Sequence, residues 1–271
     1  KILADGSLDS AFRENALLLP SESMVAEQMD VVNPQAIHLA RQFMRQTIGQ
    51  ALRGELLAQY EANETPGEYS PDAISAGKRG LKNLALAYLS TAPDDEINML
   101  AQRQFDQAGN MTDRVAALAA LIHARAPAAA DALQRFYDEF DNEALVIDKW
   151  FSIQAASPAT TVAMVRELMK HPAFTLKNPN RARSLVFNFC MNNPAQFHAP
   201  DGSGYAFWAE QVKTLDALNP QVASRLARSM DRWRRYAPAL QTQMKKALQK
   251  VSGATRLSND VSEVVSKALT N

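Results

Sequence analysis

The sequence has little cysteine, little glycine and no long apolar segment, and each shortage excludes a class of protein. Cys190 is the single cysteine among 271 residues, so the chain can form neither an internal disulfide nor a thiolate metal cluster. No apolar run approaches the roughly 18 residues that a membrane-spanning helix needs. The 29 basic and 29 acidic residues cancel, which disfavours a dedicated nucleic-acid or membrane-surface protein. We therefore expect a globular protein, with the cytoplasm as the default compartment.

The residues that are abundant favour helices. Alanine occurs 45 times, against 10 glycines and 13 prolines, and aromatic residues make up 7% of the chain. This composition is typical of helical proteins rather than of sheets, which are rich in β-branched residues and turns. The chain begins at Lys1 without a targeting pattern. We therefore expect an all-α segment that belongs to a longer polypeptide.

A capping residue followed by proline recurs along the chain and predicts five places where helices begin. These pairs are Asn33-Pro34, Ser70-Pro71, Ser157-Pro158, Asn178-Pro179 and Asn219-Pro220. After Asn33, apolar residues recur every three or four positions, which predicts one long amphipathic helix to about Tyr60. A further helix is expected over 221–236. No stretch reads as a domain linker, so we predict a single domain over residues 1–271.

Two of the predicted helix starts are similar over several residues. The segments 178–183 and 219–225 both begin with Asn-Pro and lie 41 positions apart. This spacing is typical of HEAT and armadillo repeats, in which stacked antiparallel helix pairs form a curved superhelix with a concave side. Equivalent helix starts would then line one rim of that superhelix. Chance reuse of a good helix start explains the similarity equally well.

The residues that catalysis or metal binding would need do not form a recognisable motif. No two histidines lie three or four residues apart, so the H-E-x-x-H zinc pattern is absent. Gly202-Ser203-Gly204 lacks the spacing of a nucleophile elbow and reads as a turn. Cys190 lies on a predicted apolar face, where a buried, inert thiol is the usual outcome. We expect no catalytic residue and no metal ligand in this chain.

Overall neutrality conceals two segments of opposite charge. Residues 225–250 contain eight basic residues and one acid, whereas residues 131–148 contain six acids and one arginine. A solvated helix face is the ordinary interpretation of such a basic stripe. The functional alternative is a free-standing helical-repeat scaffold that binds an acidic protein partner through residues 225–250.

Arg181 and Arg183 occupy a position that helices normally keep free of positive charge. Both fall in the first turns after Asn178, where the helix dipole disfavours a cation by about 0.3 to 1 kcal/mol. A violation of this kind indicates either a structural salt bridge or a bound anion, carboxylate or peptide carbonyl. From the residues alone, both interpretations stay open.

Five ordered blocks of the sequence resemble the C-terminal helical domain of bacterial aminopeptidase N. They are Asn110-Met111-Thr112-Asp113-Arg114, residues 145–151, residues 178–185, Phe197-His198-Ala199 with residues 201–205, and residues 219–226. The resemblance is strong from about Tyr69 to the end and looser over the first 60 residues.

The resemblance implies a parent enzyme that removes N-terminal amino acids from peptides. Its zinc and its catalytic residues would lie in a thermolysin-like domain of the same polypeptide, so no zinc is expected here. The helical domain would cap the active site and restrict access to it. Arg183 and Arg225 match family arginines that face the substrate chamber, and Gln221 matches a glutamine near the pocket for the N-terminal side chain. We therefore expect these three residues to bind peptide substrates, with no nucleic acid or membrane as partner.

Overall fold

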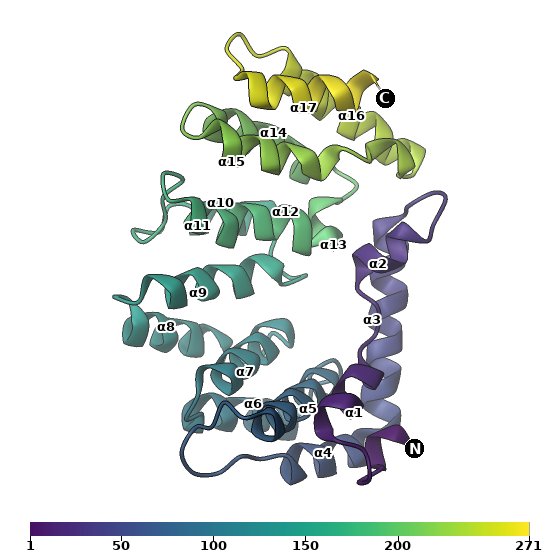
Figure 1. The fold of residues 1–271 in the computed structure, drawn as a ribbon, viewed down its shortest axis with the longest axis vertical. Coiled ribbons are helices and arrows are strands. Elements are labelled where there is room, and N and C mark those ends of the chain that lie inside the picture. The colour runs from purple at the N-terminus through teal and green to yellow at the C-terminus, as the bar shows by residue number, and fades with distance from the viewer. Residues whose placement is uncertain (271) are drawn as a thin grey trace. The chain divides into compact units, whose positions relative to one another are not determined.

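A computed structural model describes residues 1–270, which fold into helices joined by short connections (Figure 1). Within these residues no β-sheet forms, and one isolated parallel bridge joins Val32 to Tyr236. The prediction of an all-α chain is confirmed.

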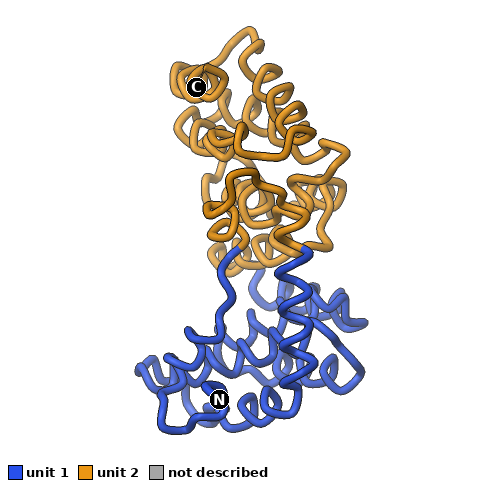
Figure 2. The backbone as a smooth tube through the Cα atoms, turned by 90° about the vertical axis from the view of Figure 1, so that its right-hand side faces the viewer, with its two compact units in different colours: residues 1–21, 39–141 blue, residues 22–38, 142–271 orange. Residues whose placement is uncertain are grey.

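The helices gather into two compact units (Figure 2). Unit 1 consists of residues 1–21 and 39–141, and unit 2 consists of residues 22–38 with the described chain from 142 onward. The division passes through one helix, α3, whose first residues belong to unit 2. That the two units act as one domain, as the sequence suggests, stays a prediction.

Unit 1 is built from helices that pack on a central helix, α5. Its elements are η1 (Ile2–Ala4), α1 (Ser10–Leu17), most of α3 (Pro34–Ala51), α4 (Arg53–Ala62), α5 (Ala73–Leu89), α6 (Asp95–Gln107), α7 (Met111–His123) and α8 (Ala129–Phe140). Helices α1, α4 and α7 all contact α5, and α7 also contacts α6 and α8. Leu81, Leu86 and Phe105 are fully buried where these helices meet.

The first of the aminopeptidase-like blocks has a structural role in unit 1. The carboxylate of Asp113 is buried, lies 2.7 Å from Lys82 Nζ and accepts a 2.9 Å hydrogen bond from Asn83. Asn110 caps α7 by accepting a hydrogen bond from the Asp113 backbone N–H. A buried ion pair of this kind is tolerated only when further hydrogen bonds satisfy it, as they do here.

Unit 2 consists of helix pairs stacked in successive layers (Figure 1). Its elements are α2 (Glu22–Glu27), α9 (Ala144–Ala156), α10 (Val162–Leu168), α11 (Pro179–Ala182), the π-helix η2 (Arg183–Phe187), α12 (Asn188–Asn192), α13 (Pro194–Phe197), α14 (Ser203–Asp216), α15 (Pro220–Ala227), η3 (Arg228–Met230), η4 (Trp233–Arg235), α16 (Pro238–Ser252) and α17 (Asn259–Thr270). Helix α14 packs against α15 and α16, and α17 packs against α15 and α16. Short connections between packed helices make the pairs antiparallel, as in armadillo and HEAT repeats.

The core of unit 2 is aromatic. Trp208 and Phe207 of α14 are fully buried, and the Phe207 ring meets Phe189 edge to face with centroids 5.7 Å apart. The indole of Trp208 donates a 3.0 Å hydrogen bond to the Leu226 carbonyl. Aromatic pairs in this arrangement add to the stability that burial of apolar surface provides. Together with the Trp208 hydrogen bond, they hold α12, α14 and α15 against one another.

Three of the five predicted helix starts are confirmed. Helices α3, α11 and α15 begin at the prolines that follow Asn33, Asn178 and Asn219, and each asparagine accepts hydrogen bonds from the first turn. The predictions at Ser70 and Ser157 are wrong. Asp72 caps α5, because its carboxylate accepts the Ser75 N–H. Ser157 instead ends α9, and Thr161 caps the next helix.

The predicted helix from Asn33 to Tyr60 is interrupted. Leu52 leaves helical geometry (φ −113°, ψ 24°), which separates α3 from α4. The break follows Gly49, where any side chain would overlap the Tyr88 carbonyl oxygen of α5. The change of direction lets Leu56 and Tyr60 of α4 bury themselves against α5. A period of three to four residues cannot reveal such a break, because both halves keep the same pattern.

The predicted helix over 221–236 is also too long. Helix α15 ends at Ala227, and the chain continues through the two short 3₁₀ turns η3 and η4. The basic residues of this segment therefore do not form one helical stripe.

The turn Gly202-Ser203-Gly204 starts α14, as expected for a turn. Gly202 has a left-handed conformation (φ 74°), which glycine adopts without strain. A side chain at Gly204 would overlap the Phe197 carbonyl oxygen. The backbone conformation at Gly202 and the close approach at Gly204 thus account for both glycines without a catalytic role.

Candidate functional site

Arg181 is held inside unit 2 by a buried ion pair. Its Nε lies 2.9 Å from Asp148 Oδ1 of α9, and the two side chains are 8% and 16% exposed. The guanidinium carbon lies 5.2 Å from the centre of the Phe151 ring. Of the two interpretations that the sequence left open, the structural salt bridge applies to Arg181.

Arg183 has the opposite environment although it is two residues away. It is the first residue of the π-helix η2, its side chain is exposed, and Nη1 donates a 3.2 Å hydrogen bond to Asn180 Oδ1. That partner is neutral, so the charge of Arg183 is not cancelled by it. Single π-turns inside helices are frequent at functional sites, because the extra residue rotates the side chains that follow.

Arg183 lines an open groove of about 430 Å³ in unit 2. The wall is formed by α9, α11, η2 and α12, and it includes Asn180, Asn188 and Asn192. Asn188 donates a 2.5 Å hydrogen bond to the Ser152 carbonyl and accepts one of 2.5 Å from Asn192. The groove therefore offers the Arg183 guanidinium beside carboxamides, which are groups suited to peptide carbonyls. The Asp148 carboxylate also lines the groove, where it is paired with Arg181.

The other two expected site residues lie on α15. Gln221 and Arg225 are four residues apart on this helix, and both side chains are exposed. Arg225 forms no hydrogen bond or ion pair with its side chain among residues 1–270. Neither residue belongs to the wall of the groove that Arg183 lines. The structure thus brings Gln221 and Arg225 together on one helix, with Arg183 on a separate element.

The asparagines of the groove are site residues that the sequence interpretation missed. Five asparagines occur between 178 and 193, an enrichment that could have drawn attention to this segment. Their spacing gave no helix-face signal, however, because the π-turn changes the register between Asn180 and Asn188.

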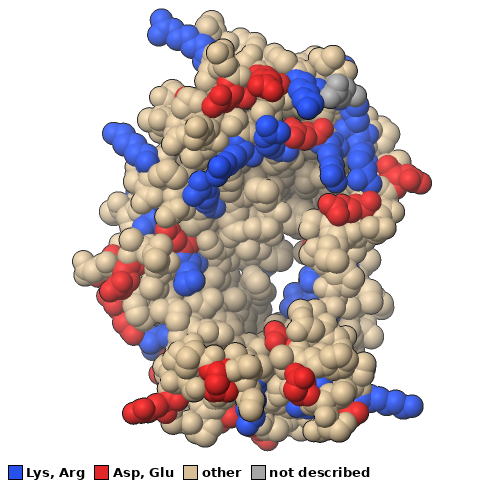
Figure 3. All heavy atoms as spheres, in the orientation of Figure 1, with Lys and Arg blue, Asp and Glu red and all other residues tan. Residues whose placement is uncertain are grey.

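Several residues of the basic segment 225–250 are engaged inside the protein. Arg235 Nη2 donates to the carbonyls of Ala26, Glu27 and Met29, at 3.4, 3.1 and 2.5 Å. Arg234 donates to the carbonyls of residues 268 and 269 at the end of α17. Lys and Arg gather over the α15 to α17 layers in Figure 3, with acidic side chains among them. The N–H donors of Arg234 and Arg235 are therefore partly used within the protein, although neutral carbonyls leave the positive charge in place.

Burial keeps two titratable groups of unit 2, Cys190 and His198, in their uncharged forms. Burial raises the pKa of the Cys190 thiol, so the thiol stays protonated and unreactive, as expected. Burial also lowers the pKa of His198 to about 3, and its Nδ1 lies 2.8 Å from the Tyr205 hydroxyl. No group of three His, Cys, Asp or Glu side chains within the described residues could hold a metal ion. The donor set that a zinc ion needs is thus missing from residues 1–270.

None of the helices within residues 1–270 combines the length and the apolar character needed to cross a membrane.

The whole described chain matches one family of helical repeats. The family model "Domain of unknown function (DUF3458_C) ARM repeats" covers residues 1–270, and the chain belongs to this family. Its armadillo-type repeats agree with the stacked helix pairs of the structure.

Three bacterial aminopeptidases N are similar to the chain, which confirms the resemblance seen in the sequence blocks. The Escherichia coli (strain K12) protein is 41% identical over 269 residues, covering 99% of this chain and 31% of its own length. The Caulobacter vibrioides protein is 38% identical over 271 residues, covering 99% and 31%, and the Haemophilus influenzae protein is 37% identical over 254 residues, covering 93% and 29%. The chain thus spans less than a third of the relatives it matches.

A solved structure agrees with the fold. The crystal structure of Legionella pneumophila aminopeptidase A in complex with aspartic acid matches with a TM-score of 0.88 and 28% identity. The match covers 99% of this chain and 32% of that protein.

Proposed function

We propose that this chain is the C-terminal helical domain of a cytoplasmic, zinc-dependent aminopeptidase of the aminopeptidase N type. In this proposal it caps the active site of a catalytic zinc domain in the same polypeptide and limits access to peptides. The observation that carries it is the match to aminopeptidases N over 99% of the chain but only 31% of their length.

The proposed contribution of this domain to peptide binding comes from Arg183, Arg225 and Gln221. Arg183 is exposed on the groove, and its hydrogen-bond partner Asn180 carries no charge. A guanidinium in this state can bind peptide carbonyls or a terminal carboxylate through several N–H donors. Gln221 and Arg225 project from α15 with spacing that lets both reach one ligand. Contacts of this kind would position the peptide for a reaction that other residues perform.

The alternative of a free-standing scaffold for an acidic protein is weaker than the sequence suggested. It needs free N–H donors on residues 225–250, and Arg234 and Arg235 already use donors of their guanidinium groups to bind backbone carbonyls inside unit 2. The similarity to aminopeptidases over nearly the whole chain also favours the enzyme-domain hypothesis.

The experiment uses the intact enzyme with two kinds of substrate. Arg183→Ala is expected to lower kcat/KM for tri- and tetrapeptides by about tenfold, since one charge-assisted hydrogen bond is lost. The kcat/KM for alanine p-nitroanilide, which lacks the later residues of a peptide, should change less than about twofold. A change in KM alone would indicate that ground state and transition state are bound equally.

The matched control is Arg256→Ala, which removes an exposed arginine from the loop between α16 and α17. It should leave both substrates unaffected. Unchanged kcat/KM for every peptide in Arg183→Ala would refute the role of this arginine, and an intact protein without aminopeptidase activity would refute the proposed parent.

A further inference from the structure

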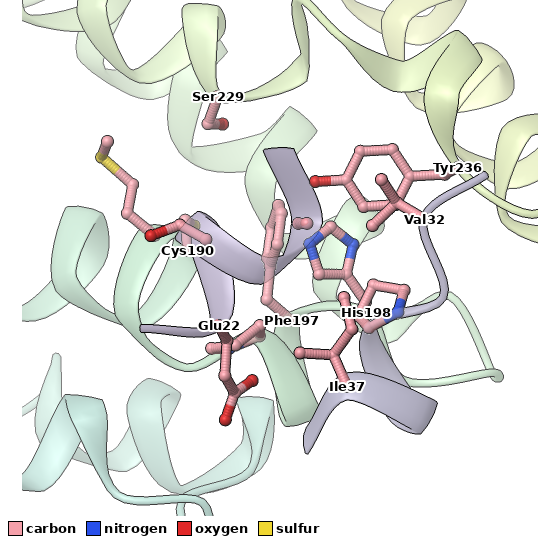
Figure 4. Close-up of a pocket in the computed structure, with 13 residues that line it drawn as sticks. Glu22, Val32, Ile37, Cys190, Phe197, His198, Ser229 and Tyr236 are labelled. Carbon is pink, nitrogen blue, oxygen red and sulfur yellow. The ribbon is translucent and has the colours of Figure 1, made fainter. Parts of the chain in front are cut away.

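Unit 2 contains a partly enclosed cavity of about 190 Å³ beside the groove that Arg183 lines (Figure 4). The two spaces adjoin, because Met191 lines both of them. The cavity walls come from α2, the start of α3 and the turn before it, the α12–α13 segment and the residues after α15. An apolar cavity of about 150 Å³ is large enough to hold benzene, so this one has room for a single aromatic ring with a small substituent.

The cavity is held open by contacts that fasten residues 22–38 to the rest of unit 2. Arg235 donates hydrogen bonds to backbone carbonyls at the end of α2 and just after it. Val32 forms a backbone bridge with Tyr236. Because both sides of the wall are fixed, a ligand would not have to order the cavity before binding.

The wall of the cavity is mostly apolar and partly aromatic. Val32, Ile37 and Phe197 line it and are each at most 6% exposed. The imidazole of His198 stacks on Tyr236, with centroids 4.8 Å apart and planes at 29°, and Phe197 meets His198 edge to face. Rings of this kind accept the ring of a ligand in offset or edge-to-face contacts.

The aromatic wall offers a ligand no counter-charge. The acid among the lining residues is Glu22, whose Oε1 lies 2.9 Å from His38 Nδ1 and whose Oε2 is sealed from solvent. Figure 4 shows this carboxylate turned away from the His198 and Tyr236 rings. Burial lowers the pKa of His198 to about 3, so the imidazole is neutral at pH 7. A charged group beside these rings would lose its water without gaining a partner, which favours an uncharged ligand.

The Tyr236 hydroxyl is a polar group through which the cavity can recognise a ligand. It forms no hydrogen bond within residues 1–270 and, unlike Glu22 Oε2, it is not sealed from solvent. Figure 4 shows it pointing towards the middle of the lining residues, on the side where Ser229 lies. The Ser229 hydroxyl donates to the Leu226 carbonyl at 2.8 Å, so it can offer the cavity an acceptor. A hydroxyl group on the ligand, which both donates and accepts, matches these two groups.

We propose that this cavity binds an uncharged phenol whose ring packs against the aromatic wall and whose hydroxyl forms a hydrogen bond with Tyr236. The ring replaces water against apolar side chains, and the hydroxyl supplies the partner that the tyrosine lacks within the described chain. A free small phenol and the tyrosine side chain of a peptide offer the same chemistry. Binding of a free phenol does not depend on the proposed peptidase activity. Binding of a peptide tyrosine, held in the adjoining groove, rests on that proposal.

The first test compares three probes of similar shape. The intact protein is labelled with ¹³C at the methionine methyl groups and titrated with p-cresol, with p-xylene, which has a methyl group in place of the hydroxyl, or with the anion p-toluate. Met191 lines the cavity, so its methyl signal should shift with the two uncharged probes, while Met99 of α6 in unit 1 should not respond. The anion should bind at least about tenfold more weakly than p-cresol. Equal binding of p-toluate, or no shift of Met191 with p-cresol, would overturn the proposal.

Three variants locate the interaction. Tyr236→Phe removes one oxygen, so p-cresol should bind about fivefold more weakly while the affinity for p-xylene stays within about twofold. The matched control is Tyr69→Phe, which removes the hydroxyl of an exposed tyrosine in unit 1 and should bind both probes like wild type. Ala26→Leu fills part of the cavity and should weaken both probes.

The p-xylene titration also shows whether Tyr236→Phe keeps its cavity. Unchanged binding of p-cresol in this variant, or an equal loss of both probes, would overturn the hydrogen bond with Tyr236. Unchanged binding of both probes in Ala26→Leu would overturn the location of the site.

A last titration distinguishes the two sources of the phenol. The probes are the blocked peptides acetyl-Gly-Tyr-Gly-amide and acetyl-Gly-Phe-Gly-amide, which differ by one hydroxyl and have no free N-terminus for an aminopeptidase to act on. A Met191 shift with the tyrosine peptide that weakens in Tyr236→Phe would support the proposal with a peptide tyrosine as ligand. A shift with p-cresol and with neither peptide would support it with a free phenol as ligand. Because these titrations do not measure peptidase activity, this proposal and the proposed function can fail separately.

Discussion

Two Asn-Pro helix starts of unit 2, at Asn178 and Asn219, begin in the same way and leave Arg183 and Arg225 exposed, but the segments that follow them differ. After Asn178, the chain passes through a π-helix into α12 and leaves Arg183 exposed on a groove. After Asn219, α15 ends within eight residues, and Arg235 further on binds backbone carbonyls of residues 26–29. A capping signal thus determines the first turn of a helix. Whether an arginine serves structure or binding depends on which acceptors the fold brings within reach.

The largest expected effect concerns the buried ion pair of Arg181 and Asp148, which belongs to the region after Asn178 (the first region). Asp148→Ala should lower the free energy of unfolding by about 3 kcal/mol, because the Arg181 guanidinium stays buried without its counter-charge. Urea unfolding of the chain measures this change. The control in the second region is Asp231→Ala, which removes an exposed partner 3.8 Å from Arg228 and should cost less than about 0.5 kcal/mol. Equal losses in the two variants would contradict the structural role of Arg181.

The next largest effect is expected in the region after Asn219 (the second region), where Arg235 binds the backbone carbonyls of Ala26, Glu27 and Met29; we call this contact the carbonyl clamp. Arg235→Ala should lower the free energy of unfolding by about 2 kcal/mol, since three carbonyls lose a charged donor and the site is half-buried. Arg232→Ala is the control, because its side chain is 68% exposed and lies 3.5 Å from Glu27. A loss of about 0.5 kcal/mol or less is expected there, and similar losses at both positions would show that the clamp adds little.

His198 stacks on Tyr236 and so links the two regions. Its titration predicts that the stability of the protein depends on pH. Burial lowers the folded-state pKa of His198 to about 3, whereas an unfolded histidine has a pKa of about 6.5. Below pH 6.5 the unfolded chain therefore binds a proton that the folded chain does not, and stability falls until about pH 3.

Between pH 7 and 5.5 this difference should remove about 1.3 kcal/mol of stability. His198→Phe keeps an aromatic ring beside Tyr236 but cannot be protonated. Its stability should therefore fall less over this pH interval, as measured by urea unfolding at both pH values. The same slope in both proteins would assign the dependence to other groups.

The smallest expected effect compares the two caps directly. Asn178→Ala and Asn219→Ala should each lower the free energy of unfolding by about 1 kcal/mol. Asn178→Ala should lower the free energy of unfolding slightly more, because Asn178 accepts hydrogen bonds from two backbone N–H groups whereas Asn219 accepts one. Ser70→Ala is the control at a predicted start that does not cap a helix, and it should lose less than half as much.

Much of the fold could be predicted from local sequence. Alanine-rich amphipathic segments and Asn-Pro caps identify helices because their signals act within one or two turns. The two helices predicted too long failed where a distant contact decided the outcome, whereas the starts at Ser70 and Ser157 failed because Asp72 and Thr161 nearby are the caps. Gly49 meets the Tyr88 carbonyl and the long helix breaks nearby, and the chain after α15 leaves helical geometry where Arg234 and Arg235 bind carbonyls elsewhere in unit 2.

The candidate site could be predicted only in part for the same reason. Arg181 and Arg183 share one sequence signal, the misplaced charge at a helix start, yet one is buried against Asp148 and the other is exposed. The cavity beside Tyr236 had no sequence signal at all, since its wall combines residues that are more than 150 positions apart.

The sequence by itself determined the all-α class, the family and three Asn-Pro helix starts, because composition, sequence blocks and capping residues act locally. Only the tertiary structure decided which arginines are exposed and where an apolar cavity forms. The physical reason is that a charged side chain binds whichever acceptor packing brings within about 3 Å, and this depends on segments far apart in the chain.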